Sequence, residues 1–199
     1  MYRAILISLI FSISITFASG AYDHGTAAGK GNIDISLTWN PFNYFKQGQS
    51  YAIFGYGISD RFDFHGYYSR FYNGDNNYYY GLFYQLYQSR RLDLSTAIGF
   101  RKYNNQNTTH LFIPQLLYTI YLTEKMYIGG SFVDIRSKDS IARIGTAVDI
   151  FLIFKIFEKK NYEVDFTIGG FNPVLWEPNT GNWYPTYSID IKIKPFLFK

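Results

Sequence analysis

Hydrophobic and polar residues alternate with a period of two through most of the chain, and residues 51–69 show this most plainly. Successive side chains of a β-strand point to opposite faces of a sheet, so this alternation predicts strands. The polar corner Ser59-Asp60 divides the stretch into two arms, which we predict to pair as an antiparallel hairpin. One face of the first arm carries Ala52, Phe54, Tyr56 and Ile58, and the second arm alternates Phe62, Phe64, Gly66 and Tyr68 with Arg61, Asp63, His65 and Tyr67.

The same hairpin pattern recurs along the chain and predicts about ten strands, with eight or twelve as alternatives. Short charged corners at Asp60, Arg90, Glu124 and Lys159 follow one another at intervals of 30, 34 and 35 residues. Looser connections rich in Asn and Gly lie between these corners. Each predicted strand has close to the ~9–11 residues that a tilted strand needs to span a bilayer.

Two positions interrupt the alternation. Pro114 cannot donate to a ladder of hydrogen bonds, so it predicts a β-bulge or a position at the rim of the sheet. Gly129-Gly130 leaves the facing of its strand open, because a bulge there would exchange the two faces.

The first twenty residues differ in composition from the rest. Arg3 precedes an uncharged apolar run over residues 4–17, and the small residues Ala18-Ser19-Gly20 follow it. This order is typical of a secretory signal peptide, so we expect cleavage between Ala18 and Ala21. A transmembrane anchor is the alternative, but the run is shorter than the ~20 residues of a spanning helix.

The chain therefore divides into three parts. Residues 1–20 are the predicted signal peptide, and residues 21–31, rich in Gly and Ala and without periodicity, are predicted as a flexible leader. Residues 32–199 hold all of the predicted strands.

The apolar and charged faces of the strands point to a membrane. A bilayer has no water to satisfy an open sheet edge, so strands that span it must close into a barrel. A lipid-facing Arg or Lys near the midplane would cost roughly 2–4 kcal/mol, and the charged residues fall on the face opposite the aliphatic and aromatic residues. We predict an all-β, closed, antiparallel up-and-down transmembrane β-barrel. An exported soluble barrel or sandwich with an apolar interior is the alternative.

Composition narrows the function. Aromatic residues make up 21% of the chain, as expected for aromatic girdles, and there is no Cys for a disulfide or a lipid anchor. Loss of residues 1–20 removes one base, Arg3, and no acid, so the net charge falls from +4 to +3. This charge is small and dispersed, which argues against a nucleic-acid partner.

Two corners resemble the periplasmic turns of small bacterial outer-membrane β-barrel proteins. They are Tyr56-Gly57-Ile58-Ser59-Asp60-Arg61-Phe62-Asp63 and Leu122-Thr123-Glu124-Lys125-Met126-Tyr127. The resemblance is to the class rather than to one family. It implies a location in the bacterial outer membrane, contact with outer-membrane lipid and lipopolysaccharide, and insertion by the outer-membrane assembly machinery. Such proteins usually end in an aromatic residue on the apolar face, whereas Phe198 shares the parity of Lys192 and Lys194.

The face opposite the apolar one is predicted to line the lumen with charges of both signs. Ion pairs across a ten-stranded barrel would fill the lumen, whereas the same residues could instead line a narrow water path. We predict a largely filled lumen, a monomer, and a structural or surface-interaction role, with a narrow passive channel for small solutes as the alternative. The predicted lumen network consists of Asp34, Arg61, Asp63, His65, Asp93, Arg101, Arg143, Asp149, Glu163, Asp165, Asp190, Lys192 and Lys194.

An enzyme is the third possibility. His65 beside Asp63 could act as a general base, but a position near a corner favours a structural contact. His110 lies where ten-stranded omptin-type proteases place a His, yet no acidic cluster accompanies it. Neither His65-Gly66-Tyr67 nor His110-Leu111-Phe112 matches the His-x-Ser arrangement of lipid A deacylases. The sequence therefore predicts no enzyme, no metal site and no cofactor.

Several aromatic residues are predicted near the outer strand ends. An interfacial belt is the simpler interpretation, and a partner-binding loop over residues 172–185 is the alternative. The predicted interface residues are Trp39, Trp176, Trp183 and Tyr184.

Overall fold

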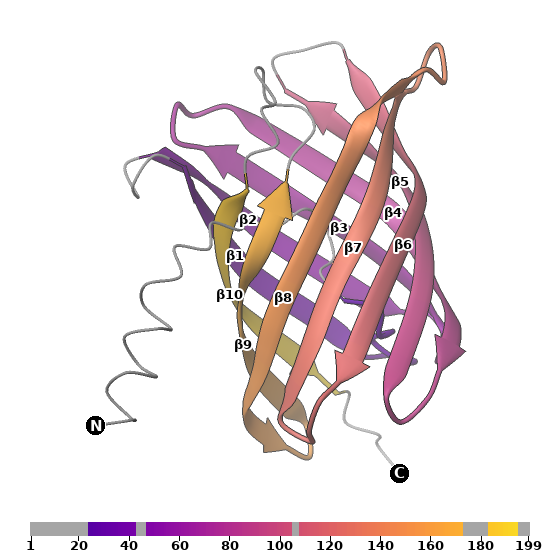
Figure 1. Ribbon diagram of the computed structural model, residues 1–199, viewed down its shortest axis with the longest axis vertical. Helices are drawn as coiled ribbons and strands as arrows, with labels where there is room; N and C mark the ends of the chain where they lie inside the picture. The colour runs from indigo at the N-terminus through magenta and orange to yellow at the C-terminus, as the bar shows by residue number, and fades with distance from the viewer. Residues whose placement is uncertain (1–23, 43–46, 105–107, 173–182, 195–199) are drawn as a thin grey trace.

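The computed structural model describes residues 24–42, 47–104, 108–172 and 183–194, and these form ten β-strands (Figure 1). The predicted signal peptide, Trp176 and Phe198 lie outside the described residues. Within the described part, no helix is long and apolar enough to cross a membrane. The strands are β1 (Ile33–Phe42), β2 (Gln47–Gly57), β3 (Phe62–Phe71), β4 (Asn76–Gln88), β5 (Leu92–Tyr103), β6 (Thr109–Tyr121), β7 (Met126–Ser137), β8 (Arg143–Lys159), β9 (Tyr162–Asn172) and β10 (Tyr184–Ile193).

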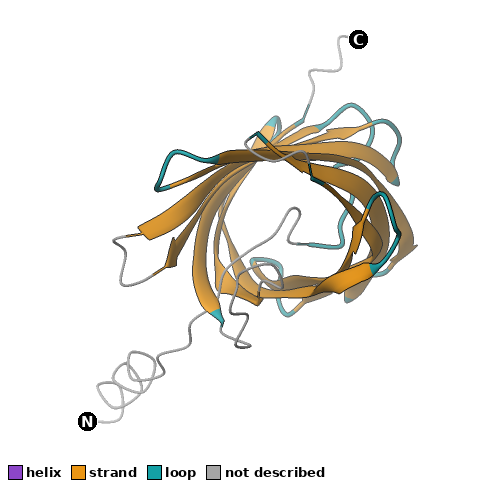
Figure 2. Ribbon diagram, turned by 90° about the horizontal axis from the view of Figure 1, so that it is seen from above, coloured by secondary structure: helices purple, strands orange, loops and turns teal. Residues whose placement is uncertain are grey.

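The strands form a closed antiparallel barrel. Each strand pairs with its neighbour in sequence, and β1 closes the ring by pairing with β10, for example Leu37 opposite Ile189. Figure 2 looks along the barrel and shows this ring. The predicted up-and-down architecture and the count of ten strands are confirmed.

The four short corners lie together at one end of the barrel, at the bottom of Figure 1, which we call the short-turn end. Three corners use the same local chemistry. The hydroxyl of Ser59 accepts hydrogen bonds from the backbone N–H groups two and three residues later, and Ser89 does the same. Thr123 accepts one from the N–H of Lys125. A Ser or Thr side chain stabilises a turn in this way, which explains why these corners resemble one another in sequence.

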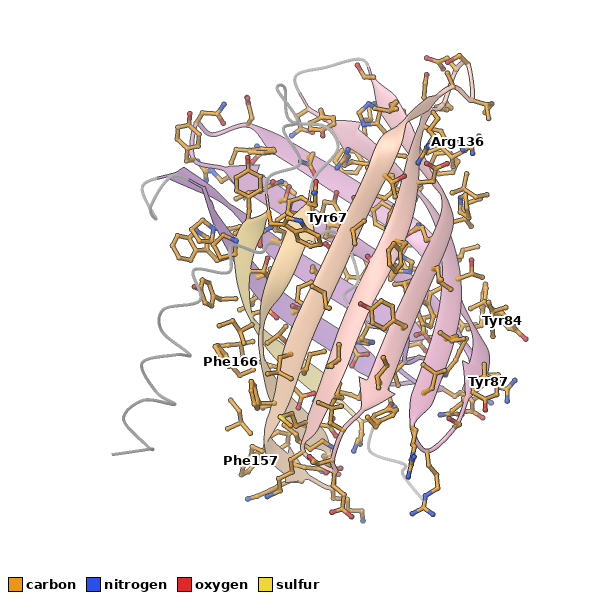
Figure 3. The ribbon with its side chains drawn as sticks, in the orientation of Figure 1. Tyr67, Tyr84, Tyr87, Arg136, Phe157 and Phe166 are labelled. Carbon is orange, nitrogen blue, oxygen red and sulfur yellow. The ribbon has the colours of Figure 1, made fainter. Side chains whose placement is uncertain are left out.

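The outer surface of the barrel is apolar. Figure 3 shows Tyr84, Tyr87, Phe157 and Phe166 pointing away from the ring. A closed sheet with no unpaired edge and an apolar exterior is what a bilayer requires, so the chain has the architecture of a transmembrane β-barrel. Large apolar side chains are exposed on every strand: Leu37, Phe54, Phe64, Leu82, Ile98, Leu116, Phe132, Ile150, Ile168 and Ile189.

Pro114 and Gly129-Gly130, which interrupt the alternation in the sequence, differ in whether they form a bulge. The register between β5 and β6 and between β6 and β7 shifts between Phe112 and Gln115, so Pro114 lies in the predicted bulge. This bulge turns Phe112 into the lumen, where it is buried, although the simple alternation placed it outside. The pairing of β7 with β8 runs without a shift through Gly129 and Gly130, so no bulge lies there.

The lumen as the candidate functional site

Residues 24–31, which we call the inner segment, run inside the barrel before β1 begins. The backbone N–H of Ala28 donates to Asp63 Oδ2 at 2.7 Å on β3. The N–H of Ala27 donates to Gln85 Oε1 at 3.3 Å on β4. The inner segment, predicted as part of a flexible leader, therefore lies against the lumen wall near the short-turn end.

Thr26 is the most connected residue of the inner segment. Its Oγ1 lies 3.0 Å from Asp93 Oδ2 on β5, and 3.0 Å each from Thr119 Oγ1 and Tyr121 Oη on β6. Tyr121 also donates to Asp93 Oδ2 at 2.9 Å. One hydroxyl thus joins the inner segment to two strands.

Small side chains let the inner segment approach the wall. A Cβ at Gly25 would lie 2.7 Å from Tyr118 Cα, and Gly57 is in close backbone contact with Gly29. A stretch rich in Gly and Ala is usually taken as mobile. The sequence signal for its position inside the barrel was Gly57 on β2, where any larger residue would collide with Gly29. The polar partners of the inner segment lie on four consecutive strands, β3 to β6, and they contact the inner segment only when the sheet curves around it.

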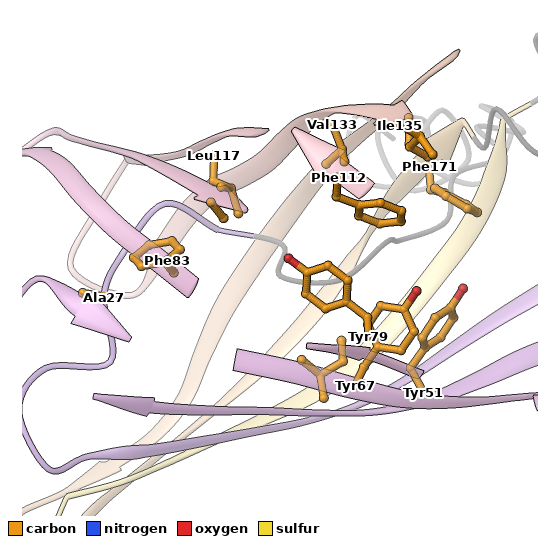
Figure 4. Packing of buried hydrophobic residues seen from close by; sticks show 13 residues of the cluster. Ala27, Tyr51, Tyr67, Tyr79, Phe83, Phe112, Leu117, Val133, Ile135 and Phe171 are labelled. Carbon is orange, nitrogen blue, oxygen red and sulfur yellow. The ribbon is translucent and has the colours of Figure 1, made fainter. Parts of the chain in front are cut away.

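A layer of aromatic side chains fills the lumen beyond the inner segment, on the side away from the short-turn end. Tyr51, Tyr67 and Tyr79 come from β2, β3 and β4, and Phe112 comes from β6 (Figure 4). The rings of Tyr67 and Tyr79 stack at 5.4 Å, and those of Tyr79 and Phe112 lie 5.2 Å apart. These four side chains are almost fully buried, so they occupy this part of the lumen.

Polar groups hold this aromatic layer in place. Tyr79 Oη lies 2.9 Å from His65 Nε2 and accepts a hydrogen bond from Gln115 Nε2 at 2.9 Å. The guanidinium of Arg101 stacks over the ring of Phe112 at 4.7 Å, a cation–π contact. His65 and Arg101, both predicted to line the lumen, do so as parts of this packed layer.

The lumen acids are held mainly by hydroxyl groups. Ser131 donates to Asp149 Oδ2 at 2.5 Å and Thr167 donates to Asp190 Oδ2 at 2.6 Å, while Tyr127 donates to Asp165. Asp63 and Asp93 bind the inner segment as described above. Ten of the predicted residues line the lumen in addition to Arg101: Asp34, Asp63, His65, Asp93, Asp149, Glu163, Asp165, Asp190, Lys192 and, at its edge, Lys194.

Ion pairs among the predicted network occur near the short-turn end. Lys192 Nζ lies 3.9 Å from Asp34 Oδ2. Glu163 Oε2 lies 3.2 Å from Lys155 Nζ and 3.7 Å from Lys194 Nζ. The charges therefore pair at one end of the lumen, rather than throughout it as predicted.

Two of the predicted lumen residues lie elsewhere. Arg61 is exposed in the corner between β2 and β3. The register of β7 and β8 shifts between Ile135 and Arg136. Arg143 pairs with Arg136 beyond this shift and lies on the outer face of the barrel. There its Nε donates to Asp134 Oδ1 at 2.7 Å, and Asp134 Oδ2 also accepts from Arg136 at 2.8 Å. Figure 3 shows Arg136 near the barrel end opposite the short turns.

The predicted aromatic belt is also divided between the two faces. Trp39 shares the outer face of β1 with the exposed Leu37. Tyr184 is wrongly predicted as an interface residue, because it packs against the buried apolar cluster of the lumen. Trp183 directly precedes β10 and is partly buried.

The candidate catalytic histidines are held by structural contacts. Asp63 accepts from Ala28, and His65 contacts Tyr79. His110 packs edge-on against Tyr103 and lies 3.3 Å from Arg101. Across the described residues, no group of three or more His, Asp or Glu side chains converges closely enough to hold a metal ion.

A cavity of about 710 Å³ remains at the short-turn end, beside the inner segment. Its mouth is formed by corner residues, including Arg90, Arg91 and Glu124. Its wall carries the carboxyl groups of Asp34, Glu163, Asp165 and Asp190, with Lys155 and Lys192 as the wall cations. The lining also includes Tyr121 and Tyr127 and the apolar residues Ile53 and Ile153.

No known protein family and no curated protein matches this sequence. Among solved structures, the chain is similar to the KdgM porin, alone and in complex with disordered oligogalacturonate. Each comparison has 8% identity, a TM-score of 0.48, and covers 82% of this chain and 99% of the other. It is also similar to a structure titled "De novo design of transmembrane beta-barrels", at 12% identity and a TM-score of 0.40, covering 83% of this chain and 97% of the other.

Proposed function

We propose that this protein is a closed outer-membrane barrel with a structural or surface-interaction role, rather than a channel or an enzyme. The observation that carries the proposal is the hydroxyl of Thr26, which binds Asp93, Thr119 and Tyr121 at 3.0 Å each. These contacts hold the inner segment inside the lumen. A solute crossing the barrel would have to displace it.

The aromatic layer supports the same function. Tyr51, Tyr67, Tyr79 and Phe112 are buried beyond the inner segment, so two barriers lie in series. Native protein interiors are packed as tightly as organic crystals. Opening the lumen therefore requires both the inner segment and the aromatic layer to move.

A narrow channel is the second candidate, favoured by the cavity of about 710 Å³ at the short-turn end. This cavity lies at one end of the path that a solute would take. The channel would become active if the inner segment and the aromatic layer both moved aside.

Placement in the membrane follows the usual pattern for such barrels, with short turns in the periplasm and longer loops outside. We propose insertion by the outer-membrane assembly machinery as a monomer, with lipid and lipopolysaccharide around the apolar surface. The outward pair Arg136 and Arg143 would then lie at the external membrane interface, where lipopolysaccharide phosphates are found.

Conductance in planar bilayers tests the proposed function. The mature protein is expected to give no stable single-channel steps. The double variant Thr26→Val with Tyr79→Ala loses the hydroxyl contacts of the inner segment and a ring of the aromatic layer, and it is expected to show brief openings. Thr26→Ser alone retains a hydroxyl and stays silent. Steady single-channel steps from the unaltered protein would refute the closed lumen and establish the channel.

A further inference from the structure

The wall of the cavity holds more acid than base. Its lining holds five carboxyl groups against four bases: Asp34, Glu124, Glu163, Asp165 and Asp190 against Arg90, Arg91, Lys155 and Lys192. Lys155 lies 3.2 Å from Glu163, and Lys192 lies 3.9 Å from Asp34. No ion pair within 4.0 Å joins Asp165 or Asp190 to a cation among the described residues. Lys155 lies opposite Asp165 in the pairing of β8 with β9 but forms its ion pairs with Glu158 and Glu163.

Asp165 and Asp190 are also direct cross-strand neighbours in the pairing of β9 with β10. Like charges directly opposite one another destabilise a sheet. Both carboxylates accept hydrogen bonds from neutral hydroxyl groups, of Tyr127 for Asp165 and of Thr167 and Ser188 for Asp190. Oδ1 of Asp165 is buried and accepts no hydrogen bond from the described residues.

Asp34 is a second, independent observation that points to a ligand. Both of its carboxylate oxygens are shielded from solvent and accept no hydrogen bond within the described part of the chain. Its ion-pair partner Lys192 stays 3.9 Å away, beyond hydrogen-bonding distance. A carboxylate removed from water without such bonds is costly, and this one lines the cavity.

We propose that this cavity binds an alkylammonium group between Asp34, Asp165 and Asp190. An ammonium is a compact positive charge with three N–H donors, which suits carboxylates that are spread around a wall. A divalent metal fits less well, because the described residues hold no converging set of three ligands. Ile53 and Ile153 supply an apolar surface for the alkyl part.

The ammonium has two possible sources. One is a free amine that enters from the short-turn end. The other is the amino terminus of the mature chain, since His24 lines the cavity and the predicted cleavage leaves only a few residues before it. At about 3.5 Å per residue, so short a stretch keeps the new terminus near the cavity.

Two measurements on the folded mature protein in detergent separate these sources. Intact mass first identifies the amino terminus. An amine-reactive ester is then added at neutral pH, where α-amino groups are less protonated than lysines, and labelling of the N-terminal peptide is followed by mass spectrometry. In parallel, calorimetry measures binding of 1,4-diaminobutane.

If the mature terminus occupies the site, its labelling is about tenfold slower in the folded protein than in urea, as expected for a charge-assisted contact. The variants Asp165→Asn and Asp190→Asn then restore labelling. If a free amine occupies the site, the terminus labels at the same rate in both states. In that case 1,4-diaminobutane binds saturably, and about tenfold more weakly to Asp165→Asn.

The control Asp139→Asn removes the same charge from an exposed turn at the other end of the barrel and is expected to behave like the unaltered protein. Asp165→Glu keeps the charge and distinguishes lost binding from lost folding. The proposal is overturned if the terminus labels freely and the diamine does not bind. It is equally overturned if the protection of the terminus or the binding of the diamine is the same in Asp165→Asn and Asp190→Asn as in the unaltered protein. Neither result depends on whether the barrel conducts.

Discussion

Two acidic parts of the lumen wall differ in what their acids contact. On β3 and β5, Asp63 and Asp93 bind the inner segment through Ala28 and Thr26. On β1, β9 and β10, Asp34, Asp165 and Asp190 line a cavity instead. The difference shows that the chain fills only one side of its lumen, and that the partners of a buried acid cannot be inferred from its strand alone.

The largest expected effect comes from separating the inner segment from its wall. In Gly57→Val the new side chain would collide with the backbone of Gly29, which cannot move aside as a flexible side chain could. We expect a loss of about 3 kcal/mol in the free energy of unfolding, measured by urea titration in lipid vesicles. We also expect proteases to cleave within residues 24–31. The neighbouring exposed residue supplies the control Ile58→Val, and equal stability of the two variants would contradict the described contact.

The next prediction compares an acid that binds the inner segment with an acid that lines the cavity. Asp93→Asn weakens the bonds from Thr26 and Tyr121, so we expect a loss of about 2 kcal/mol. Asp34→Asn removes a carboxylate that accepts no described hydrogen bond, so we expect a change of less than about 1 kcal/mol, or a gain. Both are measured by the same urea titration. Equal losses would show that an acid bound to the inner segment and an acid lining the cavity contribute equally to stability.

A smaller effect is expected from the inner segment itself. Thr26→Val preserves the shape of the side chain but removes its hydroxyl contacts, for an expected loss of about 1–1.5 kcal/mol. Thr26→Ser retains the hydroxyl and is expected to lose less than half as much. The two variants are compared by urea unfolding, and a larger loss in the Ser variant would argue that the methyl group matters more than the hydroxyl.

The smallest effect lies at the edge of the cavity. Lys194 pairs with Glu158 at 3.4 Å and with Glu163 at 3.7 Å, and its side chain is 34% exposed. Exposed pairs of this kind contribute little, so Lys194→Gln is expected to lose no more than about 0.5 kcal/mol. Repeating the unfolding experiment at high salt should abolish the difference. A loss that persists in high salt would place this pair in a more shielded site than the structure shows.

Local patterns predicted the parts of the fold that depend on neighbouring residues. The corners at Ser59, Ser89 and Thr123 follow from side chains that bond their own turns. The bulge at Pro114 follows from its missing N–H. The burial of Phe112 was not predicted, because a bulge changes the facing of every residue on one side of it.

Arg143 and Tyr184 show the same limit. A register shift between β7 and β8 moved Arg143 to the outer face, beside Asp134. Tyr184 faces the lumen, where it packs against the buried cluster. For Arg143 the strand was predicted correctly and the face was not, whereas Tyr184, predicted in the loop over residues 172–185, is the first residue of β10.

The sequence by itself determined that this protein is an antiparallel barrel with an apolar exterior, because alternation and turn chemistry act over a few neighbouring residues. Only the tertiary structure decided how the lumen is filled. Residues 24–31 are held by side chains from β3, β4, β5 and β6, and these contact the inner segment only when the sheet curves around it into a barrel. The partners of Thr26 lie 67, 93 and 95 residues away in sequence, and no local pattern specifies contacts at that separation.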